Sequence, residues 1–248
     1  VVLVEAEIWP NLLWRLADRD TPTFLVNARL SDRSAKRYAQ FKGLFDSIFS
    51  SLAGVGVQNE TDATTVASVG CHPKRISVTG NLKFDAVDLT TQHSLNPLEL
   101  IRWAGAPSEA LVLLGSSTHA GEERVLGEIF LRLRDRFENL FLVIVPRHFE
   151  RGPDVGRELE AMGIQYRFRS EFGGEVGGSE TRGDCLIVNS TGELRFFYEI
   201  ASVVFIGKSL LAHGGQNPIE AAAAACAVVT GPYMENFRAI TKTFLKAK

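Results

Sequence analysis

The sequence predicts an α/β protein built on parallel sheets, and two observations lead to this class. Short runs rich in Val, Ile and Phe alternate along almost the whole chain with stretches whose apolar residues recur at helical spacing. Strands separated by helices pair in parallel, and the helices cover both faces of the sheet. With 248 residues, the chain can form one large domain or two modest ones.

Ten short apolar runs are expected to be strands. They cover residues 1–4, 23–26, 54–57, 75–78, 111–114, 141–145, 165–168, 185–188, 203–206 and 227–229. Helical patterns cover residues 10–18, 32–49, 61–69, 121–136, 151–162, 192–200 and 218–225, with further helices expected from Asn96-Pro97 and over 234–248. Ligands of open parallel sheets bind outside the carboxyl ends of the strands, so the site should lie there.

A polar stretch at residues 85–96 interrupts the alternation and predicts a domain boundary. We expect a first domain of residues 1–88 and a second of residues 89–248. Residues 171–183 hold five glycines and three glutamates without periodicity, which predicts a surface loop. The chain begins within a strand and its last helical pattern ends without a capping signal, so we expect it to be truncated at both ends.

Composition excludes several classes of protein. Lys and Arg number 27 against 29 for Asp and Glu, a net charge of -2, which argues against nucleic-acid binding through bulk electrostatics. Cys71, Cys185 and Cys226 are widely spaced and form no C-x-x-C pair, so we expect buried thiols and neither a disulfide framework nor a metal site. The apolar runs are far shorter than a membrane span.

The glycine-rich loop after residues 203–206 is the strongest candidate site. Gly214 and Gly215 allow a ligand to approach the main chain closely. Asn217 and Pro218 suit the cap and first position of a helix, whose free N–H groups favour an anion. Glu220 could accept hydrogen bonds from a ribose diol. Its spacing from Asn217 also fits a capping box, which would make the pair structural.

A second small-residue loop follows the strand at residues 111–114. Ser117 or Thr118 would cap the next helix, and Glu122 and Glu123 suit the positive end of its dipole. Helix capping explains the two acidic residues, but it does not explain why the turn lacks bulky side chains. The close approach of a ligand to the turn would explain that feature.

Two further strand ends place polar residues at the same edge. Arg147, His148 and Arg151 follow residues 141–145, and a guanidinium group suits a carboxylate or phosphate. A structural ion pair is the alternative. Ser190 and Glu193 have capping-box spacing, yet they begin a third helix at this edge. Three helix starts beside two arginines favour a nucleotide-phosphate crevice.

The first domain offers two candidate groups. Glu5 and Glu7 lie two apart at a strand end and should point to the same side, where they could bind hydroxyls or serve in acid–base chemistry. Exposed loop acids are the alternative. Arg29, Arg33 and Arg37 gather near a helix start, where the dipole disfavours cations. They form either a solvated face or a binding site for an anionic substrate.

Seven motifs occur in the order found in one family. They are E-A-E-I-W-P (5–10), N-A-R-L-S (27–31), G-N-L-K-F-D (80–85), G-S-S-T-H-A-G-E-E (115–123), P-R-H (146–148), G-E-L (192–194) and H-G-G-Q-N-P-I-E (213–220). In combination they resemble the 3-deoxy-D-manno-octulosonic acid (Kdo) transferases of lipopolysaccharide biosynthesis, over essentially the full length of the chain.

This resemblance implies a GT-B glycosyltransferase with two Rossmann-like domains facing a cleft. It implies CMP-Kdo as donor, a lipid A precursor as acceptor, inverting transfer without metal or other cofactor, and no nucleic-acid partner. It also implies a place at the cytoplasmic face of the bacterial inner membrane, through an anchor outside this chain. The general base is expected before Val1, with Glu5 and Glu7 in support and Arg29, Arg33 and Arg37 binding acceptor. The implied donor-binding residues are Ser117, Thr118, Arg147, Gly192, Glu193, Lys208, Ser209, Gly214, Gly215, Asn217 and Glu220.

The chain departs from the family pattern at five positions. They are Ala6, Phe149, Asn189, Gln216 and Ala221. Gln216 replaces a histidine but can still form hydrogen bonds, so the change does not exclude CMP binding. Two other readings of the site remain open, namely a nucleotide-sugar epimerase on the same fold and a nucleotide-binding module without catalysis.

Overall fold

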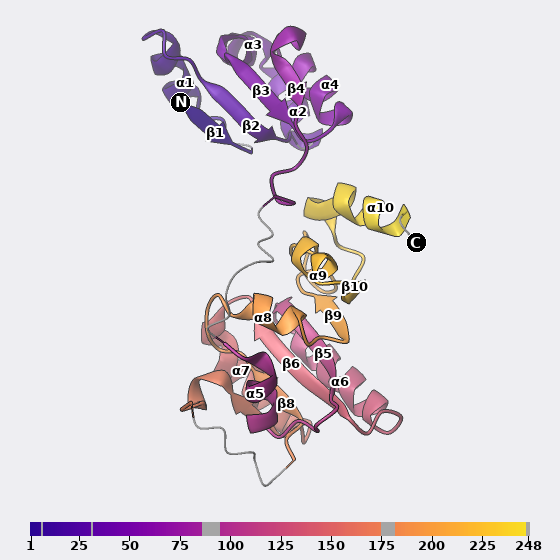
Figure 1. The fold of residues 1–248 in the computed structure, drawn as a ribbon. Coiled ribbons are helices and arrows are strands. Elements are labelled where there is room, and N and C mark those ends of the chain that lie inside the picture. Colours follow the sequence, from indigo (N-terminus) through magenta and orange to yellow (C-terminus); the bar gives the residue numbers. More distant parts are fainter. Residues whose placement is uncertain (6, 31, 86–94, 175–181, 247–248) are drawn as a thin grey trace. The chain divides into compact units, whose positions relative to one another are not determined.

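The computed structural model describes the chain except residues 6, 31, 86–94, 175–181 and 247–248. The chain divides into two compact units, Val1–Ala86 and Val87–Lys248 (Figure 1). The boundary predicted at residues 88–89 lies outside the described residues, and so does most of the loop predicted at residues 171–183. No helix in the described part of the chain is both long and apolar enough to cross a membrane.

The first unit is built on a parallel sheet in the order β1-β2-β3-β4. Its elements are β1 (Val2–Val4), α1 (Pro10–Ala17), β2 (Phe24–Ala28), α2 (Asp32–Gln40), α3 (Lys42–Ser51), β3 (Gly54–Val57), α4 (Glu60–Ser68), the 3-10 turn η1 (Pro73–Arg75) and β4 (Ile76–Val78). Leu25 and Val55 of the sheet are buried in one core with Leu13, Phe49 and Val66 of the helices. This core fixes the strand ends that carry the polar residues of the unit.

The single helix predicted over residues 32–49 is wrong. The chain leaves the helical conformation at Phe41, with φ −108° and ψ 41°, and α2 and α3 form separately. Phe41 is 59% exposed, whereas Ile48 and Phe49 are fully buried. Burial of these two side chains outweighs the helical continuity that the sequence pattern favoured.

The second unit is built on a six-stranded parallel sheet in the order β10-β9-β5-β6-β8-β7. Its strands are β5 (Leu111–Thr118), β6 (Leu140–Pro146), β7 (Tyr166–Phe168), β8 (Cys185–Ile187), β9 (Val203–Ile206) and β10 (Ala227–Thr230). Its helices are α5 (Pro97–Trp103), α6 (Glu122–Arg134), α7 (Gly152–Ala161), α8 (Leu194–Tyr198), α9 (Ile219–Ala223) and α10 (Arg238–Lys246), with 3-10 turns η2 (Phe149–Arg151), η3 (Arg169–Glu171) and η4 (Glu235–Phe237).

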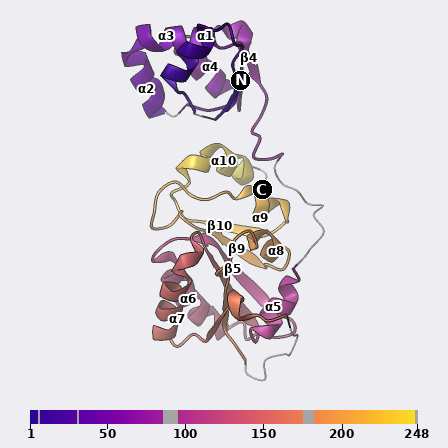
Figure 2. The same ribbon diagram turned by 90° about the vertical axis from the view of Figure 1, so that its left-hand side faces the viewer.

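Helices cover both faces of this sheet (Figure 2). Leu126 of α6 and Leu159 of α7 pack on one face, against strand residues such as Leu142. Leu100 of α5 and Phe197 of α8 pack on the other face. The α/β class with two parallel sheets, predicted from the alternation of strands and helices, is therefore confirmed.

The strand order changes direction at β5, because β6 pairs with one side of it and β9 with the other. In open parallel sheets, the crevice outside the carboxyl ends at such a switch point is the usual ligand site. β5 runs to Thr118, beyond its predicted end at residue 114, because Gly115 and Ser116 keep pairing with β6 and β9. The switch point is therefore lined by the loops that follow Thr118, Pro146 and Ile206.

The cysteines are free thiols, but one expectation about them is corrected. Cys71 and Cys185 are buried, while Cys226 is only half-buried. The Cys226 Sγ lies 3.0 Å from the Tyr198 carbonyl oxygen, to which it donates. Burial raises the pKa of this thiol, which keeps it protonated at neutral pH.

Candidate functional site

The backbones of the loops after β5 and β9 are in direct contact at the switch point. The Gly207 N–H donates to the Ser116 carbonyl at 2.8 Å. A Cβ atom on Gly207 would stand 2.1 Å from the Ser117 carbonyl oxygen, so this approach requires glycine. Ser117 and Lys208 both have left-handed backbones, with φ of 51° and 56°. Such strain in residues with a Cβ persists only where surrounding contacts enforce it, and it is typical of functional sites.

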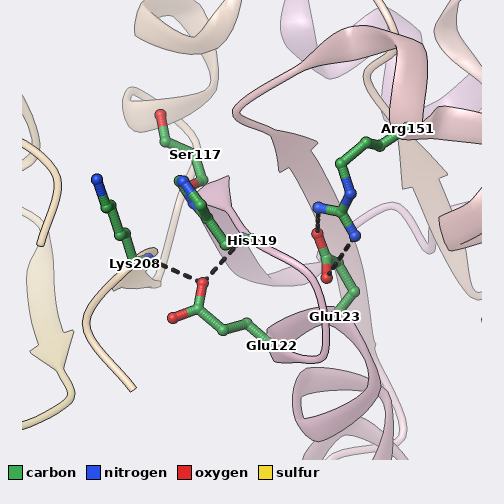
Figure 3. A network of polar contacts seen from close by, with 6 residues as sticks. All are labelled: Ser117, His119, Glu122, Glu123, Arg151 and Lys208. Carbon is green, nitrogen blue, oxygen red and sulfur yellow. Dashed lines mark hydrogen bonds and ion pairs between the residues drawn. The ribbon is translucent and has the colours of Figure 1, made fainter. Parts of the chain in front are cut away.

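The carboxylate of Glu122 enforces this arrangement (Figure 3). Glu122 is fully buried. Its Oε2 accepts hydrogen bonds from the backbone N–H of His119 at 2.9 Å and of Lys208 at 2.8 Å. Its Oε1 accepts from the N–H of Ser209 and of Leu210, both at 3.1 Å. One side chain thus ties the two loops together, a role that sequence reasoning missed.

The helix cap predicted at Ser117 or Thr118 is wrong. α6 begins at Glu122, and its N-cap is Gly121 with φ 88° and no side-chain cap bond. The reason is that β5 extends to Thr118, so the residues predicted as caps still belong to the strand. Glu122 lies in the first turn as predicted, but its carboxylate is taken up by backbone groups of another loop.

Backbone N–H groups of the glycine-rich loop are already engaged within the chain. The Gly214 N–H donates to Glu235 Oε2 at 2.8 Å, and the Gly215 N–H donates to the Lys208 carbonyl at 2.9 Å. The Ile219 N–H donates to Asn217 Oδ1 at 3.1 Å, but the N-cap of the five-residue α9 is Pro218 and not Asn217 as predicted. Gly214 and Gly215 are buried. An anion at this edge of the sheet would therefore be bound mainly by side chains and not by these backbone N–H groups.

The side chains left for an anion come from three adjacent strand ends. In the described residues, Lys208 after β9 and Arg147 after β6 form no ion pair with a carboxylate, and Arg147 is exposed. The His119 and His148 rings lie 6.3 Å apart. Burial lowers the pKa of His119, and this effect exceeds the opposing effects of the Ser117 carbonyl and of the Glu122 charge. Figure 3 shows Ser117, His119 and Lys208 extending the same way, away from Glu122.

The two arginines after β6 have different surroundings. Arg151 Nη1 lies 2.6 Å from Glu123 Oε1, in an ion pair whose acidic side chain is completely buried. The hydrogen bond to Glu123 raises the pKa of Arg151. Arg151 therefore forms the structural ion pair that was the alternative to anion binding. Arg147 remains available to bind an anion.

Two predicted donor contacts lie beneath the loops. Thr118 and Ser209 are fully buried. The Ser209 hydroxyl donates to the Ile206 carbonyl and accepts from the Gly231 N–H at 2.8 Å. Thr118 Oγ1 is buried and has no hydrogen-bond partner within the described part of the chain. Neither hydroxyl is open to a ligand in this structure, because both residues belong to the strand end and its supporting turn.

The remaining predicted donor residues lie after β8 and β9. Glu193 Oε1 pairs with Arg169 Nη2 at 3.0 Å, and its other oxygen accepts from the Ser190 hydroxyl. The capping box, which was the alternative for Ser190 and Glu193, does not form among the described residues. Gly192 is exposed, with φ 79°. Glu220 is exposed in α9, and in the described residues it makes no capping bond to the start of its helix.

In the first unit, three of the motifs meet at one polar cluster. Glu5 Oε1 accepts from Asn27 Nδ2 at 3.3 Å and pairs with Lys83 Nζ at 3.0 Å. The Leu82 N–H donates to Asn27 Oδ1 at 3.2 Å. Glu7 instead accepts from Trp9 Nε1 at 2.7 Å. Glu5 and Glu7 were expected to point to the same side because alternate residues of a strand do so. β1 ends at Val4, however, and the backbone of Glu5 is left-handed with φ 61°, so this argument does not apply to them.

The arginine group is spread along its helix. Arg29 is half-buried before α2 and lies near enough to Asp62 to affect the pKa of that carboxyl. Arg33 is in α2, and its side chain lies outside the described part of the structure. Arg37 is exposed in the last turn, where the helix dipole favours a cation. The argument from crowding at the helix start therefore no longer applies to Arg37.

Comparison with known proteins gives consistent matches. The family model for 3-deoxy-D-manno-octulosonic-acid transferase (Kdo transferase) matches residues 1–86. The whole chain is 31% identical, over 249 residues, to the 3-deoxy-D-manno-octulosonic acid transferase of Haemophilus influenzae, and covers 56% of that protein. It is 32% identical over 240 residues to the transferase of Bordetella pertussis, of which 54% is covered. The chain thus spans about half the length of these curated relatives.

Two solved structures are similar to this one. The C-terminal CMP-Kdo binding domain of WaaA from Acinetobacter baumannii is 28% identical and has a TM-score of 0.51, covering 56% of this chain and 70% of that structure. The UDP-GlcNAc 2-epimerase of Methanocaldococcus jannaschii has a TM-score of 0.55 over 97% of this chain and 69% of its own, but at 15% identity it shows the fold alone. By sequence, the chain is similar over its whole length to 3-deoxy-D-manno-octulosonic acid transferases.

Proposed function

We propose that the protein to which this chain belongs transfers Kdo from CMP-Kdo to a lipid A precursor. One observation carries the proposal. Lys208, Arg147 and His119 lie at the strand switch point of a chain that is similar to a solved CMP-Kdo binding domain. The donor carries a phosphate and the sugar's carboxylate, and two cations with a neighbouring imidazole suit such an anion.

The proposed reaction is an inverting displacement. An acceptor hydroxyl attacks the anomeric carbon and loses its proton to a base, while CMP departs with the electron pair of the broken bond. Negative charge builds on the leaving phosphate as that bond breaks, so positive side chains placed beside it stabilise the transition state more than the bound donor. Lys208 and Arg147 are proposed for this task, and no metal ion is required. Glu220 is proposed to bind the ribose hydroxyls.

Acceptor binding is proposed for the first unit. Arg29, Arg33 and Arg37 supply positive charge to an anionic lipid, and the polar cluster of Glu5 and Asn27 lies at the carboxyl edge of the same sheet. A lipid acceptor requires the enzyme to work at a membrane surface. We therefore propose the cytoplasmic face of the bacterial inner membrane as its location.

Calorimetric titration with CMP, UMP and UDP tests the donor class. We expect CMP to bind and UMP and UDP to bind at least about tenfold more weakly, a difference of roughly 1.4 kcal/mol. Preference for UDP would instead favour an epimerase on this fold. The absence of binding by all three nucleotides would overturn the proposed donor site.

A further inference from the structure

Glu122 is a buried acid that the proposed reaction does not use. Its side chain is fully buried, and among the described residues no cation pairs with it. Burying a carboxylate costs free energy unless hydrogen bonds compensate its charge. Here the compensation comes from four backbone N–H groups, those of His119, Lys208, Ser209 and Leu210. Such an arrangement needs a reason beyond the capping of α6.

Three of those N–H groups are consecutive along the chain. The N–H groups of Lys208, Ser209 and Leu210 converge on the two oxygens of one carboxylate. A run of converging N–H groups forms a concavity of the kind that binds anions. In this protein the concavity holds a side chain of its own, so its conformation is fixed before any ligand arrives.

The fixed conformation decides where Lys208 points. Its backbone is left-handed, with φ 56°, a state that a residue with a Cβ adopts only under constraint. Glu122 Oε2 binds the Lys208 N–H and the His119 N–H together, so one oxygen sets the spacing of the two loops. The Lys208 stem also passes Gly214, whose Cβ position would lie 3.8 Å from Lys208 Cε. The side chains of Lys208 and His119 then extend together from this anchor (Figure 3).

We propose that Glu122 is a positioning residue for the anion site. By filling the backbone concavity at residues 208–210 and binding the His119 N–H, it holds Lys208 and His119 toward one phosphate or carboxylate of the donor. The inference rests on the proposed function, because it assigns the task of Lys208 to donor binding. It adds that the geometry of that lysine is set by a carboxylate which never touches the ligand.

Glu123 provides a matched control. It is the next residue of α6 and is equally buried, but its carboxylate pairs with Arg151. Among the described residues, it accepts no hydrogen bond from residues 208–210. Loss of either carboxylate should reduce stability. Only loss of the Glu122 carboxylate should also displace Lys208. The two variants therefore separate positioning from plain structural support.

The experiment measures CMP binding by calorimetry and thermal stability for Glu122→Gln, Glu123→Gln, Lys208→Met and the double variant of Glu122 and Lys208. An amide presents one acceptor oxygen in place of two, so Glu122→Gln should weaken CMP binding about tenfold or more, a typical result of one lost charged contact. Glu123→Gln should lower Tm yet keep CMP affinity within about twofold. In the Lys208→Met background, Glu122→Gln should weaken CMP binding less than it does in the wild type, because only the contribution through His119 is then left to lose.

Several results would overturn the proposal. Wild-type CMP affinity in Glu122→Gln is one, and additive losses in the double variant are another. If Glu122→Gln does not fold, Glu122→Asp decides instead, because it keeps the charge but its shorter reach cannot span both loops; wild-type affinity there also refutes positioning. A Lys208→Met variant that binds CMP normally refutes the anion site itself. That result is distinct from the case in which Lys208 matters and Glu122 does not.

Discussion

Arg147 and Arg151 lie four residues apart after β6, yet their surroundings in the structure differ. Arg151 neutralises the completely buried carboxylate of Glu123, while Arg147 is exposed at the switch point. A buried charge that loses its partner is strongly destabilising, whereas a surface charge contributes little to stability. Stability and ligand binding should therefore respond to different arginines.

Replacement of Arg151 by Met should lower the free energy of unfolding by about 3 kcal/mol, because Glu123 is left buried and unpaired. Arg147→Met serves as the control and should change stability by less than about 0.5 kcal/mol while weakening CMP binding. Urea denaturation and calorimetry measure the two effects. Equal stabilities of the two variants would show that the ion pair contributes nothing to the fold.

Replacement of Glu220 by Gln should weaken CMP binding by about 1.5–3 kcal/mol, the contribution of a charged hydrogen bond to the ribose. The fold should persist, because Glu220 is exposed and makes no capping bond in α9. Calorimetry with CMP measures the loss. Glu160→Gln, at an exposed position of α7, applies the same charge change as a control. An unchanged affinity in Glu220→Gln would remove Glu220 from the site.

The residue scale also shows where sequence reasoning stops. Cations and acids at strand ends could be named from the sequence, because a strand end and a polar side chain are local features. The hydrogen bonds of Glu122 could not be predicted from the sequence, since its partners Lys208, Ser209 and Leu210 lie 86, 87 and 88 positions away. Its place in the first turn of α6 had a complete local explanation in the helix dipole. Because the helix dipole already explained the position of Glu122, nothing in the sequence indicated its hydrogen bonds to residues 208–210.

At the scale of elements, short helices limit what a helix start can do. α8 and α9 are five residues each, shorter than the predicted spans of 192–200 and 218–225. A helix of that length aligns few peptide dipoles, so its N-terminus attracts an anion weakly. The starts of α8 and α9, two of the three that were expected to hold phosphate, therefore offer an anion little from the helix dipole. In the proposed site, the cationic side chains after β6 and β9, with the imidazole after β5, bind the anion instead.

Replacement of Arg29, Arg33 and Arg37 by Gln together should reduce binding to vesicles that contain anionic lipid. The expected loss is about 1 kcal/mol for each arginine near the surface. CMP affinity should not change, because these residues belong to the first unit. Vesicle sedimentation at low and high salt measures the effect.

A control variant removes the same charge from exposed arginines of the second unit. These are Arg124, Arg132 and Arg157. It should sediment with vesicles as the wild type does. Equal loss in both variants would mean that overall charge, and not this helix, determines lipid binding.

At the scale of the whole chain, the alternation of strands and helices predicted the ten strands found in the described residues, and their parallel pairing. It could not predict that β9 pairs with β5, because that choice depends on non-local contacts such as Gly115 with Phe205. The switch point, and with it the location of the site, follows from this one pairing. The structure was therefore needed to show which strand ends are neighbours.

The chain by itself should bind CMP but transfer no sugar. The second unit holds the cations at the switch point and Glu220, which suffice to bind a nucleotide. The attacking hydroxyl must lose its proton, however, and a positioned base typically contributes about 10²–10⁴-fold to such a step. Glu5 already pairs with Lys83, and Glu7 accepts from Trp9, so neither is placed as a ready base.

The assay for this prediction is CMP release from CMP-Kdo in the presence of a lipid A precursor. It compares this chain with a longer one extended at its N-terminus, because the H. influenzae relative is covered over only 56% of its length. Both should bind CMP with similar affinity, which controls for folding of the second unit. Only the longer chain should turn over, since orientation of the acceptor hydroxyl beside the anomeric carbon adds several kcal/mol to catalysis. Equal turnover by the two chains would contradict the prediction and would make Glu5 or Glu7 the leading candidate for the base.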